Sequence, residues 1–307
     1  MRALTEPREP AWVPAASAII RRMPAGRYRA IQAICGRVRP APFWRDIPGG
    51  GEFLCDLRDS IAREVCFTGQ YEPQETLLVR RILGPGAVFV DVGANWGYFS
   101  LLAARIVGPA GRVISLEPDP RNFARLASNA RRGGGAHWTT HEAAAAARDG
   151  ALELAGYDES GDNFGVSRIA AEGGYRVPAR RLDEFLNELS IGRTDLVKMD
   201  IEGYEDEALD GMAQGLREGR YRRILLELHP ALLAERGRDA ARVCAMLATA
   251  GYRGWAVDHS PRATSDFAYG RAGDVSALLR PLDAGKLGDW PHTLWSLAEP
   301  LPTGPRA

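Results

Sequence analysis

The stretch that decides the fold is AVFVDVGANWGYFSLLAARIV, which occupies residues 87–107. Its beginning, residues 87–92, is an apolar run typical of a strand buried on both faces of a sheet. Residues 98–107 then have the composition of a helix, and the glycines at 93 and 97 belong to the turn between the two. The stretch therefore predicts a strand, a glycine turn and a helix in direct succession.

The same alternation continues along the rest of the chain. Further strands are predicted at 112–117, 136–143, 195–200, 222–229, 252–258 and 292–298. Further helices are predicted at 120–132, 182–189, 205–218 and 239–250. Repeated strand–helix–strand order implies a parallel, doubly wound sheet, so the expected fold class is α/β.

A segment of about 144–181 interrupts this alternation. It contains three short predicted strands, at 151–154, 165–169 and 175–181, joined by turns rich in glycine, aspartate and asparagine. We expect it to form a β-meander inserted beside the sheet.

The region before the sheet has a different composition. Residues 1–68 are expected to form an N-terminal extension or cap, in which Pro24 and Gly26 interrupt any helix. The main domain is then expected to span 69–307, with a helix that begins near Pro73.

Charge and composition argue against several classes of protein. The 307 residues carry 39 basic and 39 acidic side chains, which argues against a polycationic nucleic-acid binder and against an acidic disordered chain. The longest charge-free stretch, residues 92–104, is too short for a membrane helix. Four cysteines without CxxC spacing and the lack of an apolar leader favour a cytoplasmic protein with reduced thiols. Whether the chain forms a homo-oligomer stays open.

The glycine turn after the first strand carries the first candidate binding residues. Gly93 and Gly97 would let the backbone approach a ligand where a side chain would clash, and the helix that follows offers free N–H groups. Glu117 ends the next strand, where an acid can accept both hydroxyls of a ribose. This order predicts a cofactor that contains a nucleoside. The GxxxG spacing matches S-adenosylmethionine (SAM) better than NAD, whose fingerprint is GxGxxG.

Two pairs of polar residues lie near the ends of two later strands. Lys198 and Asp200 are two residues apart, as are Glu227 and His229, so each pair points to one side of its strand. If both pairs share a side, Lys198 and Glu227 would form a deeper, structural ion pair, because a buried lysine needs a partner. Asp200 and His229 would then lie nearer the reacting group.

The identity of a general base stays open at this point. His229 has a suitable intrinsic pKa of about 6.5. Asp200 or Glu202 is an alternative, and a reaction without a protein base is a third. Glu205 is interpreted as an acid favoured by the start of its helix. Asp200, Glu202, Glu227 and His229 are also residue types that could hold Mg²⁺, although the sequence assigns no metal ligand.

Taken together and in this order, the motifs resemble the FkbM family of SAM-dependent methyltransferases. The resemblance lies in GQYEPQE (69–75), FVDVGANWGYFSLLAA (89–104), ISLEPDP (114–120), NFG (163–165), DLVKMDIEGYEDEAL (195–209) and LLELHP (225–230). It covers residues from about 69 to 230, over half of the chain. Trp96 departs from the pattern, which favours a smaller aliphatic residue there.

The resemblance implies a class I methyltransferase fold, with a seven-stranded, mostly parallel sheet and helices on both faces. It implies SAM as the methyl donor and a hydroxyl acceptor on a sugar or natural-product scaffold. The implied cofactor-binding residues are Tyr71, Glu72, Asp91, Gly93, Ala94, Asn95, Gly97, Glu117, Pro118, Glu142, Ala143 and Asp200. The predicted catalytic residues are Lys198, Asp200, Glu202, Glu227 and His229.

Other functions remain as alternatives. One is N- or carboxyl-methylation of a natural product or peptide, and another is a SAM-binding partner protein without catalysis. The expected acceptor is a small-molecule, glycosylated or peptide natural product, and we expect neither nucleic acid nor a membrane span. The acceptor pocket is expected to use the N-terminal segment, the insertion and residues 259–290, with 156–167 covering the acceptor.

Overall fold

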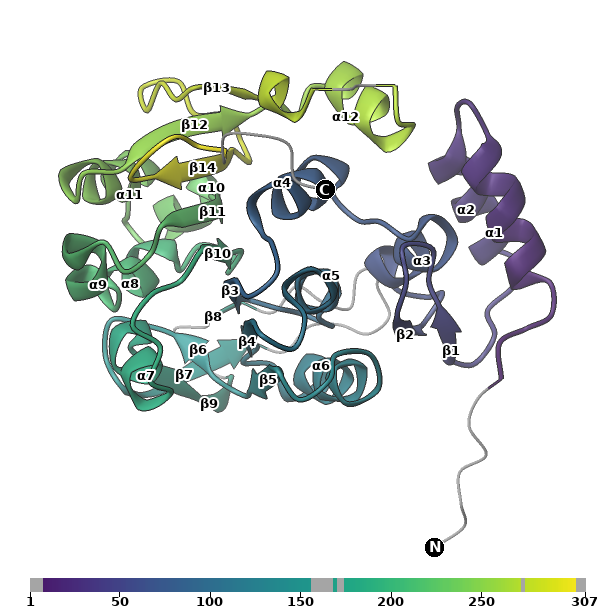
Figure 1. Ribbon diagram of the computed structural model, residues 1–307, viewed down its shortest axis with the longest axis horizontal. Helices are drawn as coiled ribbons and strands as arrows, with labels where there is room; N and C mark the ends of the chain where they lie inside the picture. The colour runs from purple at the N-terminus through teal and green to yellow at the C-terminus, as the bar shows by residue number, and fades with distance from the viewer. Residues whose placement is uncertain (1–7, 156–167, 170–173, 272–273, 302–307) are drawn as a thin grey trace, which may run out of the picture.

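The computed structural model describes residues 8–155, 168–169, 174–271 and 274–301 of the chain (Figure 1). Within these residues the main sheet has eight strands. Their spatial order is β13 (Leu279–Pro281), β12 (Arg253–Val257), β14 (His292–Ser296), β11 (Arg223–Glu227), β10 (Leu196–Met199), β3 (Val88–Val92), β4 (Arg112–Leu116) and β5 (Trp138–His141). The seven predicted strands are all present, and β13 adds an edge strand that the sequence did not predict.

Strand directions follow the expected pattern. β11, β10, β3, β4 and β5 run parallel, whereas β14 pairs antiparallel with both of its neighbours, β11 and β12. The sheet grows outward from β3 in both directions, through β4 on one side and β10 on the other. Ligands of open α/β sheets bind at such a switch point, outside the carboxyl ends of the strands.

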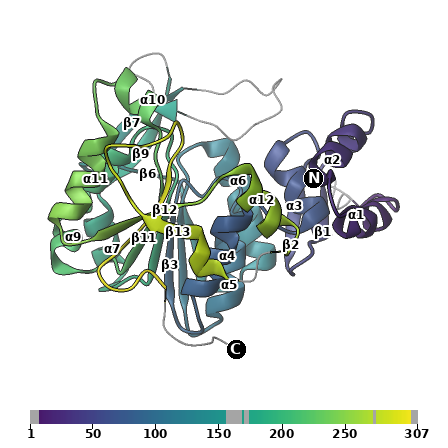
Figure 2. The same cartoon turned by 90° about the horizontal axis from the view of Figure 1, so that it is seen from above.

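Helices cover both faces of the sheet, as predicted (Figures 1 and 2). One face carries α4 (Pro73–Ile82), α5 (Tyr98–Val107) and α6 (Pro120–Gly133), and the other carries α7 (Leu182–Glu188), α8 (Glu205–Asp210), α9 (Ala213–Glu218) and α11 (Ala240–Thr249). Neighbouring residues of one strand therefore enter different cores. Phe89 packs in the core with α5, and Val90 packs in the core with α7.

The helix predicted over 205–218 is two helices, α8 and α9, so that prediction was wrong. The break falls at Gly211, where an added Cβ would lie 2.1 Å from the carbonyl oxygen of Ala146. At the break, Gly211 thus packs closely against the backbone of the insertion. The structure also contains α10 (Pro230–Glu235), α12 (Pro261–Ala268) and the 3₁₀ turn η1 (Val275–Leu278), which the sequence did not predict.

The N-terminal region is folded against the sheet domain. It contains α1 (Val13–Arg22), α2 (Arg27–Cys35), the antiparallel hairpin β1 (Phe43–Asp46) and β2 (Glu52–Cys55), and α3 (Ser60–Thr68). Phe43, Phe53 and Phe67 are fully buried and belong to the same core as α4, α5 and α6. This region therefore contributes to the hydrophobic core of the sheet domain.

The insertion forms a sheet of its own, made of β6 (Ala144–Ala145), β7 (Gly150–Ala155), β8 (Arg168–Ile169) and β9 (Tyr175–Arg180). The order is β6-β9-β7-β8, so β9 pairs with β7 and with β6 rather than with β8. The NFG motif and the segment 156–167 lie outside the described residues.

The length and apolar character of the helices can be compared with those of a membrane-spanning helix. In the described ranges, no helix combines the length and the apolar character needed to cross a bilayer.

Candidate active site

A cavity of about 380 Å³ lies at the carboxyl ends of β3, β4, β10 and β11. Cavities of this size accommodate small ligands and cofactors. Fourteen of the residues predicted to bind cofactor or to act in catalysis line it: Tyr71, Glu72, Asp91, Gly93, Ala94, Asn95, Glu117, Pro118, Ala143, Lys198, Asp200, Glu202, Glu227 and His229. Gly97 and Glu142 do not line it. Residues that are far apart in the sequence therefore lie together at one edge of the sheet.

The two glycines of the turn meet protein atoms rather than open space. Gly93 has φ +79°, and a Cβ there would lie 1.9 Å from the carbonyl oxygen of Asp200. Gly97 has φ +86°, and its Cβ would lie 2.5 Å from Leu126 and 2.9 Å from Trp138. Both positions need glycine for the left-handed backbone and for close packing. Close approach of a ligand to these glycines stays a prediction, and Gly93 does line the cavity.

Glu117 lies at the end of β4 with its carboxylate fixed by the backbone. Oε2 accepts a hydrogen bond from the N–H of Asn95 at 2.8 Å, and Oε1 accepts one from the N–H of Asp119 at 2.9 Å. Burial raises the pKa of Glu117 to about 8, even though these two hydrogen bonds oppose the rise. A carboxyl oxygen has two lone pairs, and the backbone uses one on each oxygen, so the side chain keeps capacity to bind hydroxyl groups.

Lys198 is almost fully buried on β10, and its charge interacts with several acidic side chains. Its Nζ lies 3.6 Å from Oδ2 of Asp200 and 4.7 Å from the ring centroid of Phe99. Burial alone would lower the pKa of Lys198, but the charges of Asp200, Glu72 and Asp91 raise it well above its usual value. The ammonium group therefore stays charged in this cavity.

The predicted structural pair of Lys198 with Glu227 was wrong. Strand register places Lys198 opposite Leu225, so Glu227 lies two residues further along β11. The prediction of a deeper and an outer layer was wrong for the same reason. Glu227 instead faces two histidines, with Oε1 3.7 Å from Nε2 of His229 and 3.6 Å from Nε2 of His292. Both predicted pairs do line the same cavity.

His229 follows β11 directly and is 2% exposed. Its Nδ1 lies 2.8 Å from Oε1 of Glu205, a distance at which Nδ1–H donates to the carboxylate. Its Nε2 lies 3.5 Å from Glu202 and 3.9 Å from Asp200. Glu205 thus fixes the ring so that Nε2 faces the acids of the cavity.

The surroundings of His229 set its charge. Burial would lower its pKa, but the hydrogen bond to Glu205 and the negative charges of Asp200, Glu205 and Glu202 raise the pKa to about 9. The imidazole is therefore protonated near pH 7 when the cavity holds only its own acids. Glu205 was interpreted as an acid favoured by the start of its helix, and it does lie in the first turn of α8. It also accepts from the N–H of Gly203 at 3.0 Å and positions His229.

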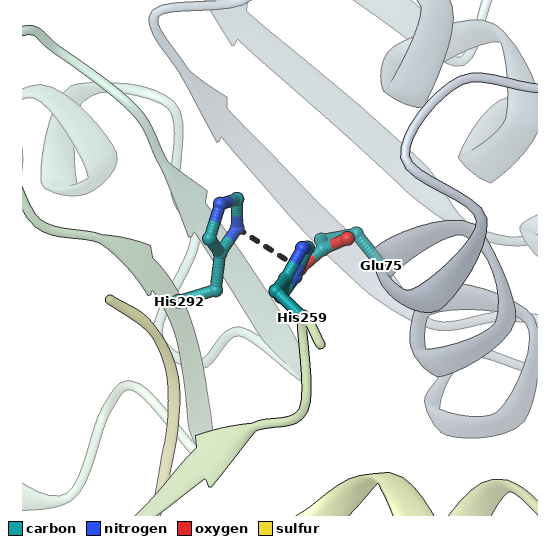
Figure 3. Close-up of side chains that lie close together, drawn as sticks. All are labelled: Glu75, His259 and His292. Carbon is teal, nitrogen blue, oxygen red and sulfur yellow. Dashed lines mark hydrogen bonds and ion pairs between the residues drawn. The ribbon is translucent and has the colours of Figure 1, made fainter. Parts of the chain in front are cut away.

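Sequence reasoning missed a second group of polar residues beside the cavity. Glu75 on α4, His259 after β12 and His292 at the start of β14 lie together, and their side chains converge (Figure 3). β14 runs antiparallel to β11, so it begins where β11 ends, and the register pairs His292 with Glu227. Only the position of β14 in the sheet could have revealed this, because His292 has no motif around it.

This group is strongly coupled by charge. His259 Nε2 lies 2.6 Å and His292 Nδ1 lies 3.0 Å from Oε1 of Glu75. Burial would lower the pKa of His292, but the charges of Glu75, Glu227 and Glu72 raise it to about 10. The two histidines hold the pKa of the Glu75 carboxyl well below its usual range, against the effect of burial.

The sheet order, the antiparallel β14 and the cavity at the switch point define a class I methyltransferase fold, as predicted. The profile of the Methyltransferase FkbM domain family matches residues 91–253, which is more than half of the chain. The chain therefore belongs to the FkbM methyltransferase domain family, and the predicted family is confirmed.

Three curated proteins show similarity over about half of this chain. The AMB antimetabolite synthetase AmbE of Pseudomonas aeruginosa is 30% identical over 185 residues, which cover 48% of this chain and 9% of that protein. The hexuronic acid methyltransferase AglP of Haloferax volcanii is 29% identical over 151 residues, which cover 46% of this chain and 56% of that protein. The 2-O-methyltransferase NoeI of Sinorhizobium fredii is 26% identical over 174 residues, which cover 50% of this chain and 70% of that protein. The chain thus spans only a small part of the first relative and about half of the second.

Proposed function

We propose that this chain binds SAM in the cavity and transfers its methyl group to a hydroxyl of a sugar or of a glycosylated natural product. The observation that carries the proposal is a cavity rich in buried acids at the switch point of an FkbM-family domain. Two relatives support the acceptor class by name, because one is a hexuronic acid methyltransferase and the other a 2-O-methyltransferase.

The charges of the cavity fit a cationic cofactor. Six acidic and two basic side chains are among the described residues that line it. Burial raises the pKa of Glu72 and of Asp91, and it raises the pKa of Glu227 to about 8. Oε2 of Glu72 is buried and has no hydrogen-bond partner among the described residues. The sulfonium and ammonium groups of SAM would offset this excess of negative charge.

The residues divide the binding between them. Glu117 would accept the ribose hydroxyls, the turn at Gly93–Asn95 would hold the methionine half, and Ala143 would lie near adenine. Asp200 and Tyr71 would enclose the sulfonium end. When bound, SAM supplies a methyl group on a cationic sulfur, ready for in-line displacement by an acceptor oxygen. Holding the acceptor in line can supply about 7–11 kcal/mol of the barrier.

His229 is the group best placed to take the acceptor's proton. Its Nε2 faces the cavity while Glu205 holds Nδ1 and stabilises the imidazolium that forms. The neighbouring acids keep His229 protonated by raising its pKa. A bound cationic cofactor would lower that pKa, so His229 could lose its proton and act as a base. Lys198, which stays charged, serves to balance the acids and has no role as a base.

Three segments with little sequence pattern line the cavity, and we propose that they form its acceptor side. Phe53 and Ile61 come from the N-terminal region, Leu154 from the insertion, and Trp290 from the segment before β14. Trp290 is 67% exposed, which is unusual for so large an apolar side chain. Its ring offers a flat face on which the C–H surface of a sugar could pack. We therefore propose that residues 1–68 form part of the acceptor pocket.

A second acceptor class follows from the relative AmbE, an antimetabolite synthetase. We propose as the alternative a natural product or peptide as acceptor, methylated on nitrogen or on a carboxylate. The site of transfer would then carry an amine or carboxylate instead of a sugar hydroxyl.

Calorimetry with SAM and with NAD tests the cofactor, and only SAM should bind. Transfer of labelled methyl from SAM is then measured on uronic acids, glycosides and short peptides, with the transferred atom identified by mass spectrometry. Label on a sugar oxygen supports the first proposal, and label on a peptide nitrogen or carboxylate supports the second. SAM binding without transfer to any acceptor would favour a partner protein without catalysis.

A further inference from the structure

Behind the wall of the cavity, three metal-binding side chains from three separate elements converge on one point. His259 Nε2 and His292 Nδ1 lie 2.6 Å and 3.0 Å from the same atom, Oε1 of Glu75 (Figure 3). The three ligand atoms all lie within 4.8 Å of one another. In a tetrahedral zinc site with bonds of about 2.0–2.1 Å, neighbouring ligand atoms lie about 3.3 Å apart. The ligand atoms therefore lie close enough to share one ion, and the two imidazole rings, now stacked with centroids 3.8 Å apart, would turn apart to direct both nitrogens at it.

The carboxylate of Glu75 carries the second, independent observation. Glu75 is 1% exposed, and its Oε2 has no hydrogen-bond partner among the described residues. Two ring nitrogens crowd one oxygen while the other is buried without a partner. An unpaired buried charged oxygen is costly, so such an atom calls for a ligand that is absent from the protein chain itself.

The donor set decides which ligand fits. Two imidazole nitrogens and one carboxylate suit a borderline transition metal ion, whereas Mg²⁺ prefers a shell of oxygens. Three protein ligands with a position left over is also the pattern of open zinc sites. We propose that Glu75, His259 and His292 bind one divalent first-row transition metal ion of the Zn²⁺ type.

The surroundings of His292 fit a metal ligand. The nitrogen that does not face Glu75, Nε2, lies 3.6 Å from Oε1 of Glu227. Metal-bound histidines commonly turn their other nitrogen toward a carboxylate, which fixes the ring. The ion would thus join α4 to the loops at β12 and β14, and it would reach the cavity through Glu227, which lines it.

The test measures metal directly, so it stands apart from any methyl transfer. The full chain is treated with a chelator, reloaded with Zn²⁺, separated from free ion, and analysed for metal by mass spectrometry. Co²⁺ then serves as a spectroscopic probe of the ligand set, and Mg²⁺ as the competing ion. We expect one Zn²⁺ per chain, a Co²⁺ spectrum with nitrogen ligation, and no displacement by Mg²⁺.

Variants assign the site. Glu75→Gln and His259→Asn should weaken Zn²⁺ binding by at least the ~10–100-fold that loss of a supporting residue costs, since they remove a ligand. His137→Ala is the matched control, because His137 contacts the carbonyl oxygen of Ala104 on α5 instead. His229→Ala should keep the ion. Zn²⁺-dependent protection against thermal unfolding in the wild type, absent in His259→Asn, separates lost binding from a lost fold.

Three results would overturn the proposal. The first is a metal content of zero in the reloaded wild type, which would make the group a hydrogen-bonded network only. The second is unchanged binding in Glu75→Gln and His259→Asn. The third is loss of the ion in His229→Ala, which would place the ion among Asp200, Glu227 and His229.

Discussion

The contact between Glu205 and His229 makes a prediction whose size follows from the structure. His229 has a pKa raised from 6.5 to about 9, with Glu205 as its hydrogen-bonded acid. Glu205→Gln keeps an acceptor at this position but removes the charge. A hydrogen bond to a charged group is worth about 1.5–3 kcal/mol, and one pKa unit corresponds to 1.36 kcal/mol. We therefore expect the pKa of His229 in the variant to fall to about 7–8.

The direction in which pH changes the free energy of unfolding follows from the same pKa shift. Because the pKa of His229 is higher in the folded protein than the unfolded value of 6.5, its stabilising contribution is complete below pH 6.5 and is lost as pH rises through 9. A shift of this size corresponds to about 3 kcal/mol of unfolding free energy. Glu205→Gln should lose about half of this pH dependence or more.

The assay is a proton NMR titration of the His229 ring in the cofactor-free protein, together with unfolding free energies between pH 6 and 10. Glu207→Gln is the matched control, because Glu207 lies on the same helix but pairs with Arg238 at 3.3 Å. A His229 pKa that stays near 9 in Glu205→Gln would refute the assignment of Glu205 as its positioning residue. A fall in both variants would show a general effect of charge instead.

Three further variants test the cavity. Glu117→Ala should weaken SAM binding by about 1.5–3 kcal/mol for each lost hydrogen bond, measured by calorimetry, while Glu218→Ala, at an exposed position away from the cavity, should bind SAM normally; equal affinities would contradict the ribose role. Lys198→Met should cost about 3–5 kcal/mol of unfolding free energy because it leaves buried acids unpaired, and a melting curve like that of the exposed control Lys286→Met would contradict this. Trp290→Ala should raise KM for a sugar acceptor and leave the Kd of SAM unchanged, and a change in SAM affinity alone would remove the acceptor role.

The fold was largely predictable because its signals are local. The strand at 88–92 and the helix at 98–107 differ from their predicted bounds by one residue at most, because an apolar run and its glycine turn depend on neighbours in sequence. The break between α8 and α9 was not predictable. Gly211 at this break packs against the carbonyl oxygen of Ala146, a contact between residues far apart in the sequence.

The site divides in the same way. Residues at strand ends, such as Asp200 and His229, were predictable as lining residues, because parallel strands end at one edge. Their partners were only partly predictable. Lys198 and Asp200 lie two residues apart on one segment, whereas the pairing of Glu227 with His292 depends on the register between β11 and β14. The close packing at Gly93 was also not predictable, because it involves the backbone of Asp200, which follows the neighbouring strand β10.

The place of β14 has a consequence for how the protein is made. β14 is synthesised after the other seven described strands of the main sheet, yet it lies between β11 and β12. Until residues 292–296 leave the ribosome, β11 has an unpaired edge and β12 has no neighbour to join it to the sheet. Contacts of such long sequence separation form slowly, and open strand edges invite pairing with other chains. Chaperones that shield strand edges should therefore hold this chain late in translation, until β14 pairs with β11 and brings His292 beside Glu227.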